Sequence, residues 1–188
     1  MINVAIFASG EGTNAENLFH YFLNDTRIKF KVVVTNKSDA GIVARAERFK
    51  KNVHLVSKAA LENYTDQLIE FLQVEQIDLI ILAGFLLKIP EKFVKAFPNK
   101  IINIHPSLLP NYGGKGMHGM HVHEAVIANH EKESGITVHF VNEEYDKGEI
   151  ILQARCTVDA ADTPEMLSKK IRQLEFEYLP KAVERFLS

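Results

Sequence analysis

The chain has little of several features that mark secreted, membrane-spanning and nucleic-acid-binding proteins. Among its 188 residues there is a single cysteine, Cys156, so no disulfide can form within the chain, which fits a reducing compartment. The first residues, Met1 to Phe7, lack the basic region and long apolar core of a signal peptide. No apolar run approaches the length of a membrane span. These absences predict a cytoplasmic protein without a membrane partner.

An excess of charge of one sign is also missing. The 22 Lys and Arg residues and 24 Asp and Glu residues give a formal net charge of -2, and they are mixed along the sequence. Without a block of Lys and Arg, a nucleic-acid or membrane surface is not expected. A phosphate site stays open, because backbone N–H groups and a few side chains suffice to build one.

What is present is the pattern of one globular α/β domain, expected over residues 1–188. Hydrophobic residues make up 46% of the chain, and there is no repeat, low-complexity segment or linker. Strand and helix patterns alternate through residue 104, which predicts a doubly wound, mostly parallel sheet. The later part of the chain predicts a C-terminal hairpin from residues 135–141 and 149–158, and a closing helix that starts at Thr163-Pro164. Residues 78–83 are apolar on both faces, as in a central parallel strand.

Two local details are predicted in the first half of the chain. Residues 59–74 have the apolar spacing of one helix. The turn at residues 36–39 offers Ser38 or Asp39 as the cap of the helix that follows it.

A glycine-containing loop, Ser9-Gly10-Glu11-Gly12-Thr13-Asn14, lies between the first strand and the first helix. Glycines there let backbone N–H groups and a helix N-terminus face an anion. The alternative is an ordinary turn with Thr13 or Asn14 as the helix cap, and the motif alone does not decide between the two. It is neither a dinucleotide fingerprint, since the third glycine is missing, nor a Walker loop, since no Gly-Lys-Ser/Thr follows.

A polar pair, Asn103 and His105, ends an apolar strand just before Pro106. The two residues are two apart, so they face the same side of an extended chain. Open α/β sheets bind ligands outside the carboxyl ends of their strands, which favours a functional pair. The alternative is a strand-end histidine that merely binds a carbonyl, which is the commoner case for a lone histidine.

An acidic residue, Asp146, could join this pair. By itself, Asp146-Lys147-Gly148 reads more simply as a solvated hairpin turn. If Asp146 lies near His105, however, the two form an acid–base unit in which the carboxylate favours the charged imidazole.

Histidines are frequent between residues 118 and 139. A metal site is not expected from them, because no suitable cysteine accompanies them and His121 and His123 are two apart, which separates them on a helix. A loop over residues 113–120 that covers substrate is the better interpretation.

Three stretches of the sequence resemble the folate-dependent formyltransferase family. They are NIHPSLLP at residues 103–110, GITVHFV at 135–141 and YDKGEIILQ at 145–153. The loop at residues 9–14 is similar to the phosphate loop of the branch that acts on glycinamide ribonucleotide in purine synthesis. The resemblance covers nearly the whole chain. It implies a Rossmann-like fold and transfer of a formyl group from 10-formyltetrahydrofolate, a cosubstrate, to the amine of glycinamide ribonucleotide.

The resemblance also implies roles for individual residues. Asn103, His105 and Asp146 match the catalytic trio, and neither a metal nor a covalent intermediate is needed. The matches at the two substrate sites are, for the ribonucleotide and its phosphate, Gly12, Thr13, Asn14 and Glu175, and, for the folate, Leu86, Leu87, Lys88, Ile89 and Asn103. Two departures stand out. The loop at residues 111–121 is longer and richer in glycine than expected, and Glu11 beside the phosphate has to point away.

Other functions remain open at this point. A formyltetrahydrofolate hydrolase uses a similar trio but releases formate. A formyltransferase that acts on methionyl-tRNA is disfavoured by the net negative charge, and one that acts on a sugar nucleotide is a further alternative. A non-catalytic nucleotide-binding module would leave Asn103 and His105 unexplained. The substrates are expected to be small molecules, and the protein a monomer or homodimer.

Overall fold

The chain forms a seven-stranded sheet in two compact units. The computed structural model describes residues 1–144 and 146–187, and the order of its strands is β3-β2-β1-β4-β5-β6-β7. The first unit contains residues 1–102 and the end of the chain, and the second contains residues 103–186. The expectation of a single domain over residues 1–188 stays a prediction.

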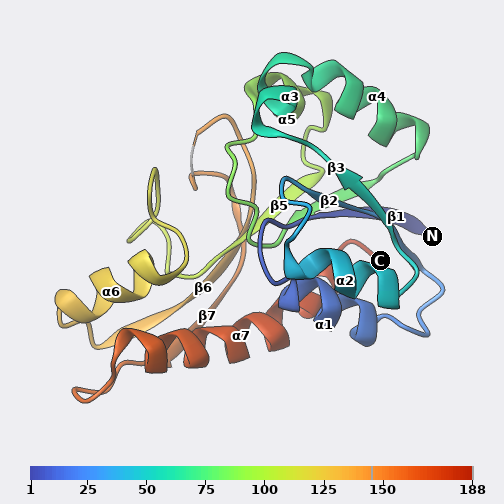
Figure 1. Ribbon diagram of the computed structural model, residues 1–188. Coiled ribbons are helices and arrows are strands. Elements are labelled where there is room, and N and C mark those ends of the chain that lie inside the picture. The colour runs from blue at the N-terminus through green and yellow to red at the C-terminus, as the bar shows by residue number, and fades with distance from the viewer. Residues whose placement is uncertain (145, 188) are drawn as a thin grey trace. The chain divides into compact units, whose positions relative to one another are not determined.

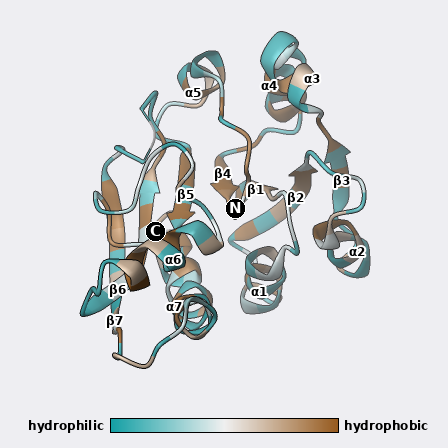
Figure 2. Cartoon of the chain, turned by 60° about the vertical axis from the view of Figure 1, so that its left-hand side comes forward, coloured by the Kyte–Doolittle hydropathy of each residue, from teal (hydrophilic) through white to brown (hydrophobic). Residues whose placement is uncertain are grey.

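The first unit is built on parallel strands. β1 pairs with β2 on one side and with β4 on the other, and β2 pairs with β3, all in parallel. The sequence of β4, Leu-Ile-Ile-Leu, is buried along its whole length and is brown throughout in Figure 2, as expected for a central strand covered on both faces. The bounds of these strands are β1 Ile2–Phe7, β2 Ile28–Thr35, β3 Asn52–Leu55 and β4 Leu79–Leu82.

Helices cover both faces of these strands. In Figure 1, α1 and α2 lie together on one side of the strands, and α3, α4 and α5 lie on the other. This doubly wound arrangement buries Phe7, Leu18, Ile42, Leu72 and Phe93 almost completely, so the core occupies both sides of the strands. The bounds of the helices are α1 Thr13–Tyr21, α2 Gly41–Arg48, α3 Lys58–Asn63, α4 Thr65–Val74 and α5 Glu91–Ala96.

Two local predictions in this unit are wrong. The single helix expected over residues 59–74 is two helices, because the chain leaves helical geometry at Tyr64 and the Thr65 hydroxyl donates to the Leu61 carbonyl. Neither Ser38 nor Asp39 caps α2, whose N-cap is Ala40. The amide that a capping oxygen would bind, that of Ile42, donates instead to the Gly10 carbonyl over 3.1 Å.

The second unit contains the end of β5 and a hairpin packed on a long helix. The bounds are β5 Ile101–His105, α6 Met120–Ala128, β6 Glu133–Phe140, β7 Ile150–Thr157 and α7 Pro164–Glu184. β6 and β7 are antiparallel, with a register from Glu133 opposite Thr157 to His139 opposite Ile150. α7 packs on both strands and on α6. The predicted fold class, a mostly parallel sheet with a C-terminal hairpin and a closing helix, is confirmed.

The beginning of α7 is fixed by three contacts. The Thr163 hydroxyl accepts the Met166 N–H, and Pro164 occupies the first helical position, where no N–H is needed. One turn and a half further along, Lys170 pairs with Asp159 at 2.7 Å and with the buried Asp162 at 2.6 Å. These contacts tie the helix to the segment that follows β7.

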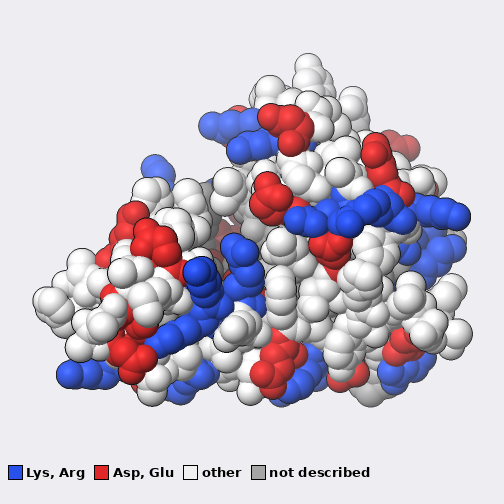
Figure 3. All heavy atoms as spheres, turned by 60° about the horizontal axis from the view of Figure 1, so that its bottom comes forward, with Lys and Arg blue, Asp and Glu red and all other residues white. Residues whose placement is uncertain are grey.

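The surface carries charges of both signs. In Figure 3, Lys and Arg side chains alternate with Asp and Glu side chains over the face that is shown, in line with the net charge of -2. Within residues 1–144 and 146–187, no helix combines the length and the apolar character that crossing a membrane requires.

Candidate functional site

The polar pair predicted from the sequence lies at the end of β5. The strand extends to His105, so Asn103 and His105 share one face of it. The His105 side chain is 5% exposed, and its Nε2 lies 2.8 Å from the carbonyl oxygen of Tyr112. A carbonyl oxygen only accepts, so Nε2 carries a hydrogen and Nδ1 of the neutral ring carries the lone pair.

Asp146 lies beside His105. Its Oδ2 is 3.7 Å from His105 Nδ1, and it accepts the Gly114 N–H at 2.8 Å. The side chain is 12% exposed, so the solvated turn considered above does not describe it. The structure therefore brings together the residues that the resemblance picked out, with His105 and Asp146 coming from segments 41 positions apart. Tyr145, which belongs to the third stretch of the resemblance, lies outside the described residues.

A second histidine, His139, completes this cluster and was given no role from the sequence. It is 2% exposed, and its Nε2 lies 3.6 Å from Asp146 Oδ1 and 3.2 Å from Asn103 Nδ2. Its Nδ1 donates to the Phe140 carbonyl at 2.8 Å, so Nε2 of the neutral ring accepts from the Asn103 amide. The Asn103 amide is thereby oriented by His139. The signal in the sequence was the alternation along β6, which places His139 on the same face as the buried Thr137.

Burial and charge act against each other in this cluster. The pKa of His105 is lowered, mainly by burial, although the Asp146 carboxylate opposes the shift. The carboxylate favours the charged imidazole, as expected, but desolvation of the ring has the larger effect. The pKa of Asp146 is lowered too: burial raises it, but the nearby His139 ring, the hydrogen bond from the Gly114 N–H and the His105 ring together lower it by more.

The segment after β5 is held in place by Thr137. The Thr137 hydroxyl donates to the Ser107 carbonyl at 2.7 Å and accepts from the Leu109 N–H at 3.0 Å. Gln153 on β7 donates to the same hydroxyl and to the Leu109 carbonyl. A buried hydroxyl with all its partners present fixes geometry, so the hairpin sets the path of the chain beyond His105.

The glycine loop of the first unit follows β1 and begins α1. Gly12 is the N-cap of α1 with φ of 72°, and no side-chain cap hydrogen bond is made there. The alternative in which Thr13 or Asn14 caps the helix is therefore wrong. A Cβ on Gly12 would lie 2.9 Å from Ile42 Cα, so both the conformation and the close approach require glycine. The first amides of α1 are left without a capping side chain, which suits an anion.

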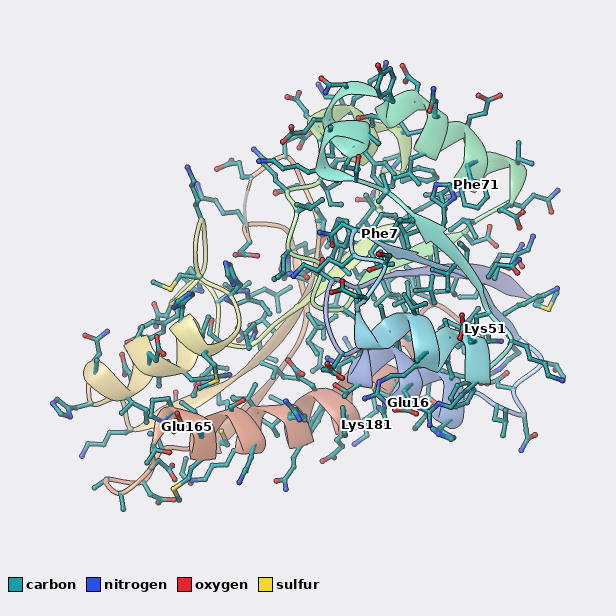
Figure 4. The ribbon with its side chains drawn as sticks, in the orientation of Figure 1. Phe7, Glu16, Lys51, Phe71, Glu165 and Lys181 are labelled. Atoms are coloured by element: carbon teal, nitrogen blue, oxygen red, sulfur yellow. The ribbon has the colours of Figure 1, made fainter. Side chains whose placement is uncertain are left out.

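The acidic residue of this loop is directed to a cation. Glu11 is 77% exposed and its carboxylate lies 3.6 Å from Arg45 of α2. Arg45 also donates to the Glu11 carbonyl at 2.6 Å and pairs with Glu16 at 2.6 Å. Figure 4 labels Glu16 on α1 beside α2, where Arg48 is its second partner. The charge of Glu11 is thus balanced within the unit, and the loop is fastened to α2.

The segment matched to the folate site follows β4, the strand next to β1. Residues 83–90 form neither helix nor strand. The Leu86 N–H donates to Ser9 Oγ at 2.9 Å, and Ser9 Oγ donates to Asn36 Oδ1 at 2.5 Å. Phe7, labelled in Figure 4, packs edge-on against Phe85 with ring centroids 5.3 Å apart. Leu86 and Lys88 are exposed, Leu87 is half-buried and Ile89 is buried.

The remaining candidate residues lie elsewhere. Glu175 is half-buried on α7. Within residues 1–144 and 146–187 no three His, Cys, Asp or Glu side chains form a group that could hold a metal ion. Burial raises the pKa of the Cys156 thiol, and a raised pKa disfavours the thiolate that a reactive cysteine needs.

Comparison with known proteins supplies the family. The model of the formyl transferase family matches residues 2–183. The chain belongs to this family. The resemblance seen in the sequence is thereby confirmed.

Relatives within the formyl transferase family extend the comparison. The chain is 40% identical to the chloroplastic phosphoribosylglycinamide formyltransferase of Arabidopsis thaliana over 186 residues, which are 96% of this chain and 63% of that protein. It is 34% identical to the Bacillus subtilis phosphoribosylglycinamide formyltransferase, covering 100% of this chain and 95% of that protein. The chain therefore spans less than two thirds of the plant relative but nearly all of the Bacillus one.

Solved structures agree with the fold. The phosphoribosylglycinamide formyltransferase of Anaplasma phagocytophilum has a TM-score of 0.90 at 33% identity, with 99% of this chain and 87% of that chain covered. The enzyme of Bacillus halodurans has a TM-score of 0.90 at 33% identity, with coverages of 99% and 95%. The Rossmann-like formyltransferase fold expected from the resemblance is confirmed.

Proposed function

We propose that this protein transfers the formyl group of 10-formyltetrahydrofolate to the amine of glycinamide ribonucleotide, a step of purine synthesis. The observation that carries the proposal is the cluster of the half-buried Asn103 and Asp146 around the buried His105, in a chain of the formyl transferase family. Such a cluster costs desolvation energy, which a ligand-binding role explains better than a purely structural one. The names of relatives that this chain covers almost completely point to the same reaction.

The chemistry requires an oxygen to be stabilised and a proton to be moved. A neutral amine attacks the formyl carbon, a C–N bond forms, and negative charge develops on the formyl oxygen. The Asn103 amide, oriented by His139, donates to that oxygen. His105, paired with Asp146, accepts the proton of the amine on its Nδ1. It then donates this proton to the folate nitrogen when the bond between that nitrogen and the formyl carbon breaks. The carboxylate stabilises the imidazolium that forms between the two steps.

The binding roles come from the family resemblance, and for the phosphate the N-terminus of α1 supports it. We assign the substrate phosphate to Gly12, Thr13 and Asn14 at the N-terminus of α1, and a contact with the ribonucleotide to Glu175. We assign folate binding to the backbone of Leu86, Leu87, Lys88 and Ile89, and to Asn103. A family model that matches residues 2–183 supports a single formyltransferase domain over residues 1–188. No metal takes part in this scheme, the substrates are small molecules, and we expect a cytoplasmic monomer or homodimer.

One assay tests the proposal. The purified protein is incubated with 10-formyltetrahydrofolate, with and without glycinamide ribonucleotide, and deformylation of the folate is followed by absorbance. We expect turnover only when the ribonucleotide is present. Equal turnover without it would identify a formyltetrahydrofolate hydrolase instead, and nucleotide binding without any turnover would leave only a binding module.

A further inference from the structure

The hydrogen bond that fixes the tautomer of His105 comes from a loop residue in an unusual conformation. Tyr112 follows the segment of residues 106–110 and precedes two glycines. Its φ is 56°, in the left-handed region that few non-glycine residues adopt. Glycine would adopt this conformation without strain. A tyrosine at this position indicates that its side chain contributes something that glycine could not.

That contribution is an anchor at the end of α6. The Tyr112 hydroxyl donates to Glu131 Oε1 at 2.7 Å and accepts from Asn129 Nδ2 at 3.1 Å. Asn129 is the C-cap residue of α6, the yellow helix in Figure 1, and Glu131 follows two residues later. The side chain is therefore held at its far end by two polar groups, while its backbone faces His105.

The same short stretch holds both members of the acid–base pair. The Tyr112 carbonyl accepts from His105 Nε2 at 2.8 Å, and the Gly114 N–H donates to Asp146 Oδ2 at 2.8 Å. The nearby Ser107 hydroxyl is closer to the Asn111 carbonyl, at 2.6 Å, than to that of Tyr112, at 3.5 Å. The imidazole N–H is thus the main donor to the Tyr112 carbonyl. Residues 112–114 consequently set the distance of 3.7 Å between His105 Nδ1 and Asp146.

We propose that Tyr112 is a positioning residue for His105. Its hydroxyl, held by Glu131 and Asn129, keeps its carbonyl where it retains the His105 hydrogen on Nε2 and leaves Nδ1, which faces Asp146, as the proton acceptor. The importance of this for turnover rests on the proposed function. The tautomer itself does not, because it follows from the contacts of the protein alone.

The test measures the tautomer and the kinetics of one set of variants. In protein labelled with ¹⁵N-histidine, the His105 signals are assigned by their loss in His105→Asn. We expect the parent protein at alkaline pH to show a protonated Nε2 and an unprotonated Nδ1. Tyr112→Phe removes only the anchoring hydroxyl, and both nitrogens should then shift toward the values of exchanging tautomers. Because one hydrogen-bonded anchor is lost, kcat should fall about 10-fold, whereas KM should change by less than about 2-fold.

Further variants separate positioning from general damage to the fold. Glu131→Ala removes the acceptor and should reproduce both effects, and the double variant should add little to either single change, because both break one connection. Glu131→Gln keeps an acceptor oxygen and should recover most of the parent kcat. Tyr64→Phe, at a tyrosine that is 59% exposed, is the matched control and should resemble the parent. If Tyr112→Phe does not fold, Glu131→Ala carries the test.

Two results would overturn the proposal. One is an unchanged pair of His105 nitrogen shifts in both Tyr112→Phe and Glu131→Ala, whatever happens to kcat. The other is a strictly additive double variant, which would mean that the two side chains act separately. If the parent transfers no formyl group but the tautomer still shifts in Tyr112→Phe, the proposed function fails and the positioning role stands.

Discussion

The glycine loop at residues 9–14 and the cluster around Asp146, the two sites of the proposed function, are built in different ways. The loop uses backbone amides, a glycine with positive φ and ion pairs at the surface. The cluster uses side chains that are buried or half-buried, with Asn103 hydrogen-bonded to His139 and the Asp146 carboxylate beside both imidazoles. A fixed negative charge on a ligand can be met by amides that never change protonation. A proton that has to move requires groups whose pKa depends on their surroundings.

The comparison predicts that the two regions respond differently to substitution. Changes in the cluster should affect the rate of the chemical step, whereas changes in the loop should affect ribonucleotide binding and stability.

The largest effect is expected from removing the carboxylate of the cluster. Asp146→Asn keeps the shape of the side chain but takes away the proton path and the charge that stabilises an imidazolium. We expect kcat to fall roughly 100- to 10,000-fold, with little change in the affinity for glycinamide ribonucleotide measured by calorimetry. Glu144→Gln, on the same turn but 63% exposed, is the control and should be close to the parent. An Asp146→Asn variant of undiminished rate would remove this residue from the mechanism.

A smaller effect is expected in the glycine loop. Gly12→Ala places a Cβ against Ile42 at a φ of 72°, and we expect it to lower the free energy of unfolding by about 1–3 kcal/mol and to raise the KM for the ribonucleotide. Gly10→Ala is the matched control, since nothing lies within 4 Å of the Cβ it would add. Urea unfolding and steady-state kinetics measure both. Equal behaviour of the two variants would mean that Gly12 has no special place in the loop.

The smallest effect concerns pH. Burial lowers the pKa of His105 and His123 below 6.5, so these rings bind a proton more readily in the unfolded chain. Their contribution to stability is present above pH 6.5 and is lost as the pH falls from there toward the lowered values. The buried His123→Leu should therefore reduce the loss of unfolding free energy between pH 7.5 and 5.5. His121→Leu, on the same helix but 66% exposed, should leave that loss unchanged, and equal slopes would contradict the assignment.

The same comparison explains what the sequence could reveal. The loop could be found because Gly10 and Gly12 lie close together in the sequence, directly after the first strand. The pattern that identifies the loop is therefore local in the sequence. His139 was given no role because only the pairing of β6 with its neighbours brings it to Asn103. The cap of α2 was mispredicted for a similar reason, since the Gly10 carbonyl that occupies the Ile42 amide comes from a different loop. The direction of the His105 pKa shift could not be predicted from the sequence, because the burial that outweighs the carboxylate is a property of the packed chain.

The contacts at the beginning of α7 have a consequence for a residue well beyond them. The position of α7 along its own axis is fixed by the cap at Thr163, by Pro164 and by the ion pair of Lys170. Glu175 lies five residues past Lys170, a rise of roughly 7.5 Å. The position of the Glu175 carboxylate along the helix axis therefore depends on the contacts at the N-terminal end of α7. A one-residue insertion between Lys170 and Glu175 would move this carboxylate along the axis and rotate it by about 100° around the axis.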